Sequence, residues 1–311
     1  MKCLVIDEMH ESITELFQKV GVVVDYRPEI TKEEIITQIS KYEGIVIRSK
    51  MVIDSFFLDK AINLKFIARA GAGLDQIEVD EVNKRGIHLV NAPEGNRDAL
   101  AEHALGMLLG LLNNIYKSDH EIRSHIWSRE GNRGYELSGK RVGLLGYGYM
   151  AGAFAKRLKA IGCTVLAYDK YKSDFSDEYV QEVTMERIFE ESDVFSVHVP
   201  LTEETLWLID GDYIKKFKKP IWLLNTARGK ILKLQDLVPL LENNKVLGAA
   251  LDVLENEKIQ SFTEGEKQLF GKLTKKNNVI LTPHVAGWSH ASYYKINEVL
   301  AKKIAEIFPY H

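Results

Sequence analysis

Short apolar runs recur along the chain, and they constrain its fold more than any other feature. Runs that are apolar through most of their length, rather than at alternate positions, are typical of parallel strands covered on both faces. Helical patterns separate these runs, so the first part of the chain predicts a parallel sheet with helices on both sides. The expected strands of this part are Cys3–Ile6, Val22–Tyr26, Gly44–Ile47, Phe66–Ala68 and Ile87–Val90.

A second series of such runs begins after Lys140. Six strands with intervening helices complete a doubly wound sheet. The chain of 311 residues is therefore predicted to be an α/β protein with two doubly wound, Rossmann-like domains and a ligand-binding cleft between them. The strands expected in the second series are Arg141–Leu145, Thr164–Tyr168, Val194–Val197, Trp222–Asn225, Leu247–Leu251 and Val279–Leu281.

Two helical segments do not fit the alternation of strands and helices. Asp98–Ile126 has one long helical pattern with no strand after it, which predicts a helix that crosses from one domain to the other. Ser289–Phe308 has apolar residues at helix spacing and no strand partner in the second sheet. We expect this last helix to return to the first domain.

Charge and cysteine content exclude several classes of protein. The chain has 41 basic and 44 acidic residues, which gives no electrostatic reason to expect nucleic acid or an acidic membrane as a partner. No apolar run approaches the ~20 residues needed to cross a bilayer. The only cysteines, Cys3 and Cys163, cannot form a disulfide framework or a four-ligand zinc site. We expect a cytoplasmic protein without a structural metal.

The strongest local motif is Gly146-Tyr-Gly148-Tyr149-Met150-Ala151, which follows an expected strand and begins an expected helix. The first glycine permits a tight turn, and the second lets the backbone approach a pyrophosphate at the helix N-terminus. Alanine at the third position is small enough for the helix to pack against the strand. The motif predicts a dinucleotide site.

An acidic residue in the expected place favours NAD as the dinucleotide. Asp169 ends the next strand, about 20 residues further on, where a carboxylate accepts from a ribose 2′-hydroxyl. The same carboxylate would repel the 2′-phosphate of NADP. Lys170 and Lys172 lie beside it in the sequence, and their positive charges would attract that 2′-phosphate.

Further motifs, together with the dinucleotide loop, occur in one order over nearly the whole chain. This ordered set resembles the D-isomer-specific 2-hydroxyacid dehydrogenases, a family that includes phosphoglycerate, D-lactate, glycerate and formate dehydrogenases. The segments are Ala70-Gly-Ala-Gly-Leu-Asp75, Asn91-Ala-Pro-Glu-Gly-Asn-Arg-Asp-Ala-Leu-Ala-Glu-His103, Asn225-Thr-Ala-Arg-Gly229, Leu251-Asp-Val-Leu-Glu-Asn-Glu257 and Thr282-Pro-His-Val-Ala-Gly287.

The resemblance implies a domain order and an assembly. Residues 1–96 and 286–311 would form the substrate domain, and residues 97–285 the NAD-binding Rossmann domain. The family also implies a homodimer that forms through the NAD domain and the long helix starting near Asp98. Because the sequence stops at His311, we do not expect the C-terminal regulatory domain of some phosphoglycerate dehydrogenases.

The resemblance assigns the catalytic roles to Arg228, Glu257 and His284. The planar fork of donors on Arg228 can hold a carboxylate and polarise the adjacent ketone. His284 can give a proton to a developing alkoxide and take it back during alcohol oxidation. Glu257 would orient the imidazole and stabilise its charged form, with Glu255 as the alternative carboxylate.

Binding roles follow from the same resemblance. It implies that the backbone amides of Ala72 and Gly73 bind the substrate carboxylate, with Arg48 at the edge of the site. The residues implied at the cofactor are Gly146, Gly148, Tyr149 and Met150 at the pyrophosphate, Asp169 at the ribose, Val199 beside the adenosine, and Ala227 and Asp252 at the nicotinamide carboxamide.

The predicted function is the NAD-dependent interconversion of a small D-2-hydroxy acid and its 2-keto acid. Candidate pairs are 3-phosphoglycerate with phosphohydroxypyruvate and glycerate with hydroxypyruvate. The segment from Pro283 to Trp288 differs from the pattern of phosphoglycerate dehydrogenases, and Arg97 stands where many members have Ser or Thr. The alternative function is an NAD-sensing co-repressor of the same fold, in which NAD promotes assembly.

Overall fold

The computed structural model describes residues 1–309. The chain divides into two compact units. One contains Met1–Ala99 and the chain from Trp288 onward, and the other contains Leu100–Gly287. No helix in the described range is long and apolar enough to cross a membrane.

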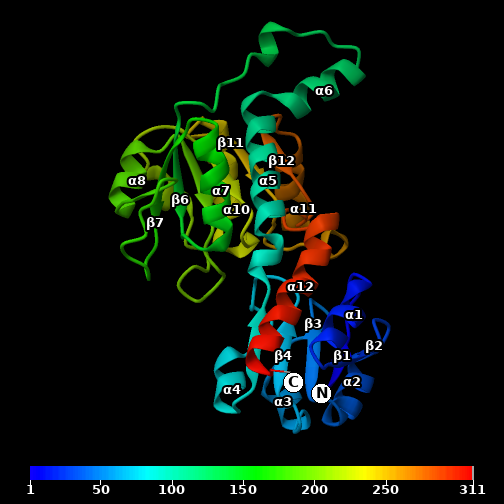
Figure 1. The fold of residues 1–311 in the computed structure, drawn as a ribbon. Helices are drawn as coiled ribbons and strands as arrows, with labels where there is room; N and C mark the ends of the chain where they lie inside the picture. Colours follow the sequence, from blue (N-terminus) through cyan, green and yellow to red (C-terminus); the bar gives the residue numbers. More distant parts are fainter. Residues whose placement is uncertain (310–311) are drawn as a thin grey trace. The chain divides into compact units, whose positions relative to one another are not determined.

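The first unit contains a five-stranded sheet in the order β2-β1-β3-β4-β5, and all of its strands are parallel (Figure 1). The apolar runs predicted a parallel, doubly wound sheet, and the structure adds that its strand order is flavodoxin-like. Its strands are β1 (Lys2–Val5), β2 (Val23–Tyr26), β3 (Gly44–Ile47), β4 (Phe66–Arg69) and β5 (His88–Asn91). Its helices are α1 (Ser12–Lys19), α2 (Lys32–Gln38), α3 (Ser55–Lys60), α4 (Val79–Lys84) and α12 (His290–Ile307).

Helices bury both faces of this sheet, which explains why its strands are apolar at successive positions. In β1, Leu4 faces a cluster that includes side chains of α2 and α3. Its neighbours Cys3 and Val5 face the opposite cluster, where α1 and α12 pack. Helix α12 begins at a capping box built by Ser289 and Ser292 and places Ile296 and Leu300 in that second cluster.

The second unit contains a seven-stranded parallel sheet in the order β12-β11-β10-β9-β6-β7-β8. The predicted doubly wound sheet is therefore confirmed, with one strand more than expected. That strand, β8, has only two polar residues, so it gave no apolar signal. The strands are β6 (Arg141–Leu145), β7 (Thr164–Tyr168), β8 (Gln181–Glu182), β9 (Val194–Val197), β10 (Ile221–Asn225), β11 (Val246–Leu251) and β12 (Val279–Leu281).

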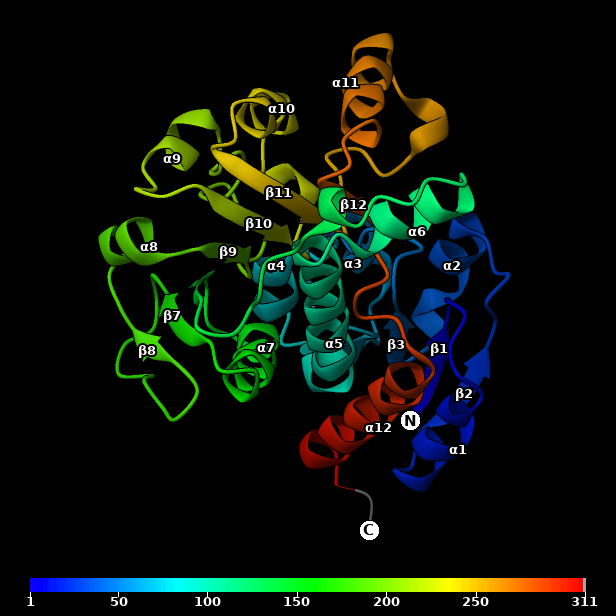
Figure 2. The same cartoon turned by 90° about the horizontal axis from the view of Figure 1, so that it is seen from above.

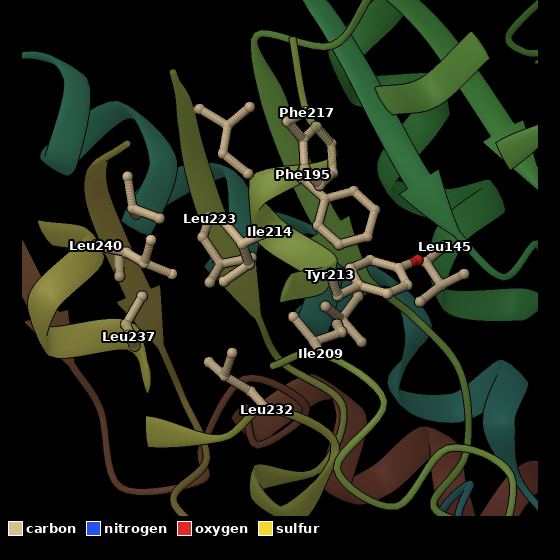
Figure 3. Close-up of a cluster of buried hydrophobic side chains, with 14 of the residues drawn as sticks. Leu145, Phe195, Ile209, Tyr213, Ile214, Phe217, Leu223, Leu232, Leu237 and Leu240 are labelled. Atoms are coloured by element: carbon tan, nitrogen blue, oxygen red, sulfur yellow. The ribbon is translucent and has the colours of Figure 1, made fainter. Parts of the chain in front are cut away.

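Helices cover both faces of the second sheet as well (Figure 2). Helix α7 (Tyr149–Ala160) and the second half of α5 (Pro93–Leu112) bury one face. Helices α8 (Met185–Glu191), α9 (Gly211–Lys215) and α10 (Leu234–Glu242) pack on the other, and Figure 3 shows Phe195, Tyr213 and Phe217 in this core. Helix α11 (Glu264–Thr274) connects β11 to β12, and short 3₁₀ turns occupy Ile39–Lys41, Glu130–Asn132, Gly229–Ile231 and Ile259–Ser261.

The prediction of one continuous helix over Asp98–Ile126 is wrong. The structure has two helices, α5 and α6 (Ile115–Arg123), and α5 begins earlier, at Pro93. The break lies at Asn114, whose φ of 54° is in the left-handed region that asparagine tolerates better than most residues. The Tyr135 amide donates to the Leu112 carbonyl at 2.9 Å and satisfies one of the last carbonyls of α5.

A glycine in β3 depends on the neighbouring strand. Gly44 lies opposite Phe66 of β4, and a Cβ on Gly44 would overlap the fully buried Phe66 ring. We predict that Gly44→Ala lowers the free energy of unfolding by about 1–3 kcal/mol, because the ring has no free space to enter. Gly271→Ala in α11, where the Cβ meets nothing within 4 Å, is the matched control and stabilises by about 0.4–1 kcal/mol. Chemical unfolding of both variants tests this, and equal midpoints would contradict it.

Candidate active site

The glycine-rich loop lies where the strand order of the second sheet reverses. Strand β6 has β9 on one side and β7 on the other, so the connections leave β6 and β9 toward opposite faces. Gly146 has a φ of 88°, and its amide donates to the Tyr168 carbonyl at 2.7 Å. A Cβ here would lie 2.8 Å from Val199 Cγ1 and 2.9 Å from the His198 carbonyl oxygen. Only glycine fits this turn.

The next part of the loop is shaped to let a ligand approach the backbone. Gly148 is the N-cap of α7, and a Cβ built on it meets no atom within 4 Å. Tyr149 and Met150 form the first turn of α7, whose amides have no partner within the helix. Ala151 is fully buried against the sheet, which explains the need for a small residue. The residues present therefore fit a pyrophosphate at this helix N-terminus.

Asp169 is held in place at the end of β7. One carboxylate oxygen accepts from the Tyr147 amide of the glycine-rich loop at 2.8 Å, and the other accepts from the Tyr171 amide at 3.0 Å. A carboxylate oxygen has more than one lone pair, so the group can accept from a ribose hydroxyl in addition. The contact with Tyr147 fixes the carboxylate beside the pyrophosphate loop.

The structure brings His284 and Glu257 together. His284 Nδ1 lies 2.9 Å from Glu257 Oε1 and 3.0 Å from Oε2. The two side chains are 44% and 46% exposed, so the pair can be reached from solvent in this unit. With Nδ1 directed at the carboxylate, Nε2 is the ring nitrogen that can exchange a proton with a substrate.

Glu255, the alternative carboxylate, has another partner. Its Oε1 accepts from the Leu234 amide at 2.6 Å, at the N-terminus of α10. It is half-buried, and this burial raises the pKa of its carboxyl group above the usual range. Of the two candidates, geometry therefore places Glu257 at the imidazole.

Arg228 lies in a tight turn after β10. The buried Asn225 side chain shapes this turn, donating to the Arg228 carbonyl at 3.0 Å and accepting from the Ala227 amide at 3.1 Å. The guanidinium donates to the Ala227 carbonyl at 2.8 Å. Gly229 follows without a side chain because a Cβ there would overlap the Leu254 carbonyl. This close approach packs the turn of Arg228 against the segment that leads to Glu257.

The sheet explains why these three residues share one edge. Strands β10, β11 and β12 are neighbours in register, with Asn225 opposite Leu251 and Leu251 opposite Leu281. Arg228, Glu257 and His284 follow the carboxyl ends of these strands in that order. Ligands of open α/β sheets bind at this edge.

Asp252 organises the loop that carries His284. Its carboxylate is 1% exposed and accepts from the amides of Val285 and Ala286, each at 2.9 Å, and from the Thr282 hydroxyl at 2.5 Å. The Asp252 carbonyl accepts from the His284 amide at 2.7 Å. These bonds hold His284 at a φ of 56°, a left-handed conformation that costs free energy for a residue with a side chain.

His103 joins this network, although the sequence showed it only as the last residue of a family segment. Its Nε2 lies 3.1 Å from the Thr282 hydroxyl and 3.7 Å from Asp252 Oδ1. The residues are far apart in sequence, so no local motif could reveal the contact. It links α5 to the loop of His284.

In the first unit, the loop after β4 presents two backbone amides. Gly71, at a φ of 136°, turns the chain, and the Ala72 carbonyl accepts from the Asn91 side chain at 2.7 Å. Within residues 1–309 the amides of Ala72 and Gly73 donate to no acceptor. Adjacent amides of this kind can bind a carboxylate.

Arg48, in the same unit, has one contact through its backbone amide and another through its guanidinium. The buried Asp7 carboxylate accepts from the Arg48 amide at 2.7 Å. The guanidinium carbon lies 4.3 Å from the centroid of the Trp288 ring, and Tyr293 packs against that ring at 4.9 Å. The cation–π contact restricts the positions that the Arg48 side chain can adopt. Arg97 is exposed on α5.

The motifs and the fold agree with a match to a known family. Residues 105–286 match the model of the NAD-binding domain of D-isomer-specific 2-hydroxyacid dehydrogenases, which is more than half of the chain. The chain belongs to this family. The model that matches is that of an NAD-binding domain, which agrees with the NAD site that the glycine-rich motif predicted.

Relatives that are named for different substrates match the chain to a similar degree. The chain is 35% identical to D-3-phosphoglycerate dehydrogenase of Archaeoglobus fulgidus over 99% of its length, but it spans only 57% of that protein. It is 32% identical to hydroxypyruvate reductase of Thermotoga maritima, covering 96% of this chain and 95% of that protein. Among solved structures, D-lactate dehydrogenase of Aquifex aeolicus, complexed with NAD and lactic acid, aligns with a TM-score of 0.83 at 26% identity, over 99% and 95% of the two chains.

We predict that Asp252→Asn disables the His284 loop. The amide group of Asn has one acceptor oxygen, so one of the amides of Val285 and Ala286 would face a donor. Each lost charge-assisted hydrogen bond costs about 1.5–3 kcal/mol. The variant should show a lower unfolding midpoint and a large loss of turnover. Asp212→Asn, an exposed helical position, is the matched control. Unchanged turnover in Asp252→Asn would contradict this role.

Proposed function

We propose that the chain catalyses the reversible, NAD-linked reduction of a small 2-keto acid to its D-2-hydroxy acid, with phosphohydroxypyruvate and hydroxypyruvate as the candidate keto acids. The pairing of His284 with Glu257 at the carboxyl edge of the sheet carries this proposal. Glu257 and His284 follow neighbouring strands of one sheet, and Arg228 follows the next strand, so a proton donor, a negative charge and a guanidinium belong to one edge of that sheet.

We assign to each residue a step that suits its chemistry. A nicotinamide dinucleotide held at the glycine-rich loop and Asp169 would supply the hydride for carbon 2 of the keto acid. His284 Nε2 donates a proton to the carbonyl oxygen during reduction and accepts it during oxidation. Glu257 stabilises the imidazolium form, and the Arg228 guanidinium holds the carboxylate and polarises the ketone. Gly146, Gly148, Tyr149, Met150, Asp169, Val199, Ala227 and Asp252 are the proposed cofactor-binding residues.

We assign substrate binding to the first unit, so that residues 1–96 and 286–311 form the substrate domain and residues 97–285 the NAD domain. The amides of Ala72 and Gly73 support this assignment because they have no acceptor in the described chain. Two free amides on a short loop match the two oxygens of a carboxylate. Arg48 adds a positive charge that Trp288 keeps in place.

A panel of 2-keto acids tests the proposal. NADH absorbance is followed with pyruvate, hydroxypyruvate, glyoxylate, phosphohydroxypyruvate and 2-ketoglutarate, and the product is resolved into its D and L isomers. The expected result is oxidation of NADH with at least one of the two candidates and a D product. NADH binding without turnover of any keto acid would favour the co-repressor alternative.

We predict that removing the charge of Glu257 shifts the pH dependence of both reaction directions. Reduction needs a protonated His284 and oxidation needs a neutral one, so the rate of reduction falls and that of oxidation rises as pH increases. Glu257→Gln removes the charge that favours imidazolium. It should move both pH–rate limbs to lower pH, because the imidazolium form of His284 loses its charged partner.

A substitution of His284 tests its role in proton transfer. His284→Asn should reduce turnover by roughly 10²–10⁴ while sparing NADH binding. His88→Asn, at an exposed position of β5, is the matched control. If Glu257→Gln keeps the pH–rate profiles of the wild type, Glu257 has no part in the mechanism.

Arg48 supports a substrate with a second anionic group. We predict that Arg48→Gln lowers the ratio of kcat/KM for phosphohydroxypyruvate to that for hydroxypyruvate by about 10–100-fold, since a charge-assisted contact contributes about 1.5–3 kcal/mol. Trp288→Leu should lower the ratio less, because it releases the arginine without removing it. Arg97→Gln tests whether the second arginine takes part. An unchanged ratio in Arg48→Gln and Arg97→Gln would assign the chain to an unphosphorylated substrate.

We further propose a homodimer that forms through α6 and the segment after it. This part of the second unit extends away from the sheet (Figure 1). Its exposed apolar side chains are Ile115, Tyr116, Ile122, Ile126 and Trp127, and the Trp127 side chain is 85% exposed. Exposed apolar residues concentrated in one segment are typical of protein interfaces, and two-fold pairs are the commonest soluble oligomers.

We predict that Trp127→Ser weakens this dimer by at least tenfold in Kd, since buried tryptophans contribute about 2 kcal/mol or more at interface centres. Ile62→Ser, at an exposed apolar residue of the first unit, should leave association unchanged. Light scattering across a concentration series checks both. A wild-type monomer at micromolar concentration would refute the assembly.

A cytoplasmic location remains our expectation. Both cysteines are free thiols and buried, and burial raises the pKa of Cys163 to about 11. Such thiols stay protonated at neutral pH and resist oxidation. Free thiols fit a reducing compartment.

A further inference from the structure

We propose that Glu204 is a second determinant of the preference for NAD over NADP, acting by holding Lys170 away from the ribose 2′-position. Lys170 Nζ lies 2.7 Å from Glu204 Oε2. The Tyr171 hydroxyl donates to the same oxygen at 2.5 Å. Both partners of Glu204 directly follow Asp169, and no sequence motif identified this carboxylate.

The position of Glu204 in the fold links it to the cofactor site. Asp169, Lys170 and Tyr171 follow β7, whereas Glu204 follows β9. Strands β7 and β9 flank β6, which carries the glycine-rich loop. The contacts of Glu204 therefore join the two segments on either side of that loop. This inference rests on the proposed placement of the ribose at Asp169.

Local charge explains why a second carboxylate is needed. Lys170 and Lys172 place two positive charges beside Asp169, and a cluster of this kind attracts a 2′-phosphate. Lys172 Nζ donates to the Tyr147 carbonyl at 2.8 Å, which directs it to the glycine-rich loop. Glu204 neutralises Lys170, and the hydrogen bond from Lys170 lowers the pKa of Glu204, so it stays ionised. With both carboxylates ionised, these four side chains carry no net charge.

The inference changes the expected effect of substitutions at Asp169. Asp169→Asn removes one repulsive charge but leaves Lys170 paired with Glu204. The single variant should therefore weaken NAD binding without creating a good site for a 2′-phosphate. Glu204→Gln releases Lys170 while Asp169 still accepts from the ribose. The double variant should bind the 2′-phosphate best relative to NAD.

Calorimetry with two matched probes tests this without relying on turnover. ADP-ribose and its 2′-phosphate differ only in the group to be discriminated, and both are titrated into the intact protein. In Glu204→Gln, the ratio of affinity for the 2′-phosphate to that for ADP-ribose should rise by about fivefold, the range of an exposed ion pair. In Asp169→Asn/Glu204→Gln it should rise further, by at least about tenfold.

Two further variants identify the cause. Lys170→Met/Glu204→Gln should lose the gain, because the gain requires the released ammonium. Glu264→Gln breaks a similar exposed pair with Lys267 on α11, at the opposite edge of the sheet, and should leave the ratio unchanged.

An unchanged ratio in Glu204→Gln, or a gain that persists without Lys170, overturns the inference while the proposed function stands. Failure of wild-type protein to bind ADP-ribose would instead refute the cofactor site itself, and the inference with it.

Discussion

The buried carboxylate of Asp252 is the interaction on which the candidate active site most depends. His284 adopts a left-handed backbone conformation, and a residue with a side chain keeps it only where the surroundings impose it. Asp252 imposes it by accepting from two amides and one hydroxyl of the loop. The imidazole then contacts Glu257, which follows β11 as Asp252 does. Without that loop conformation, the pairing of acid and base has no fixed geometry.

Carboxylates that accept hydrogen bonds from loop amides also occur at the other candidate binding loops. Asp169 accepts from amides at the glycine-rich loop, and Asp7 accepts from the amide of Arg48. In each case a carboxylate at the end of one strand fixes the loop after another by satisfying its backbone donors. Charge-assisted bonds of this type are stronger than neutral ones, so they position a loop that has little apolar surface to bury. The two parallel sheets thus provide rigid edges, and at each edge a single carboxylate positions a loop of the proposed ligand sites.

Much of the fold could be predicted because its signal is local. A parallel strand buried on both faces must be apolar at most of its positions, and each strand of three or more residues left that pattern in the sequence. Two features of the fold were not predicted, because no local apolar pattern marks them. Strand β8 consists of two polar residues and pairs only because β7 offers an unpaired edge. The break at Asn114 lies inside a continuous helical pattern, and the Tyr135 amide that satisfies the Leu112 carbonyl beside it comes from another segment of the chain, so the pattern gave no sign of it.

The sequence by itself determined the family, the cofactor class and the residue types that the chemistry needs, because these rest on motifs in a fixed order. The motif order selected Glu257 over Glu255 in one acidic stretch, but the sequence could not show the contact of Glu257 with His284 or that of Glu255 with the Leu234 amide. Nor could it reveal His103 beside Thr282, Trp288 over Arg48, or Glu204 beside Lys170. Each of these pairs joins residues distant in sequence. The tertiary structure decided them, because only the packing of strands and helices brings such side chains within reach.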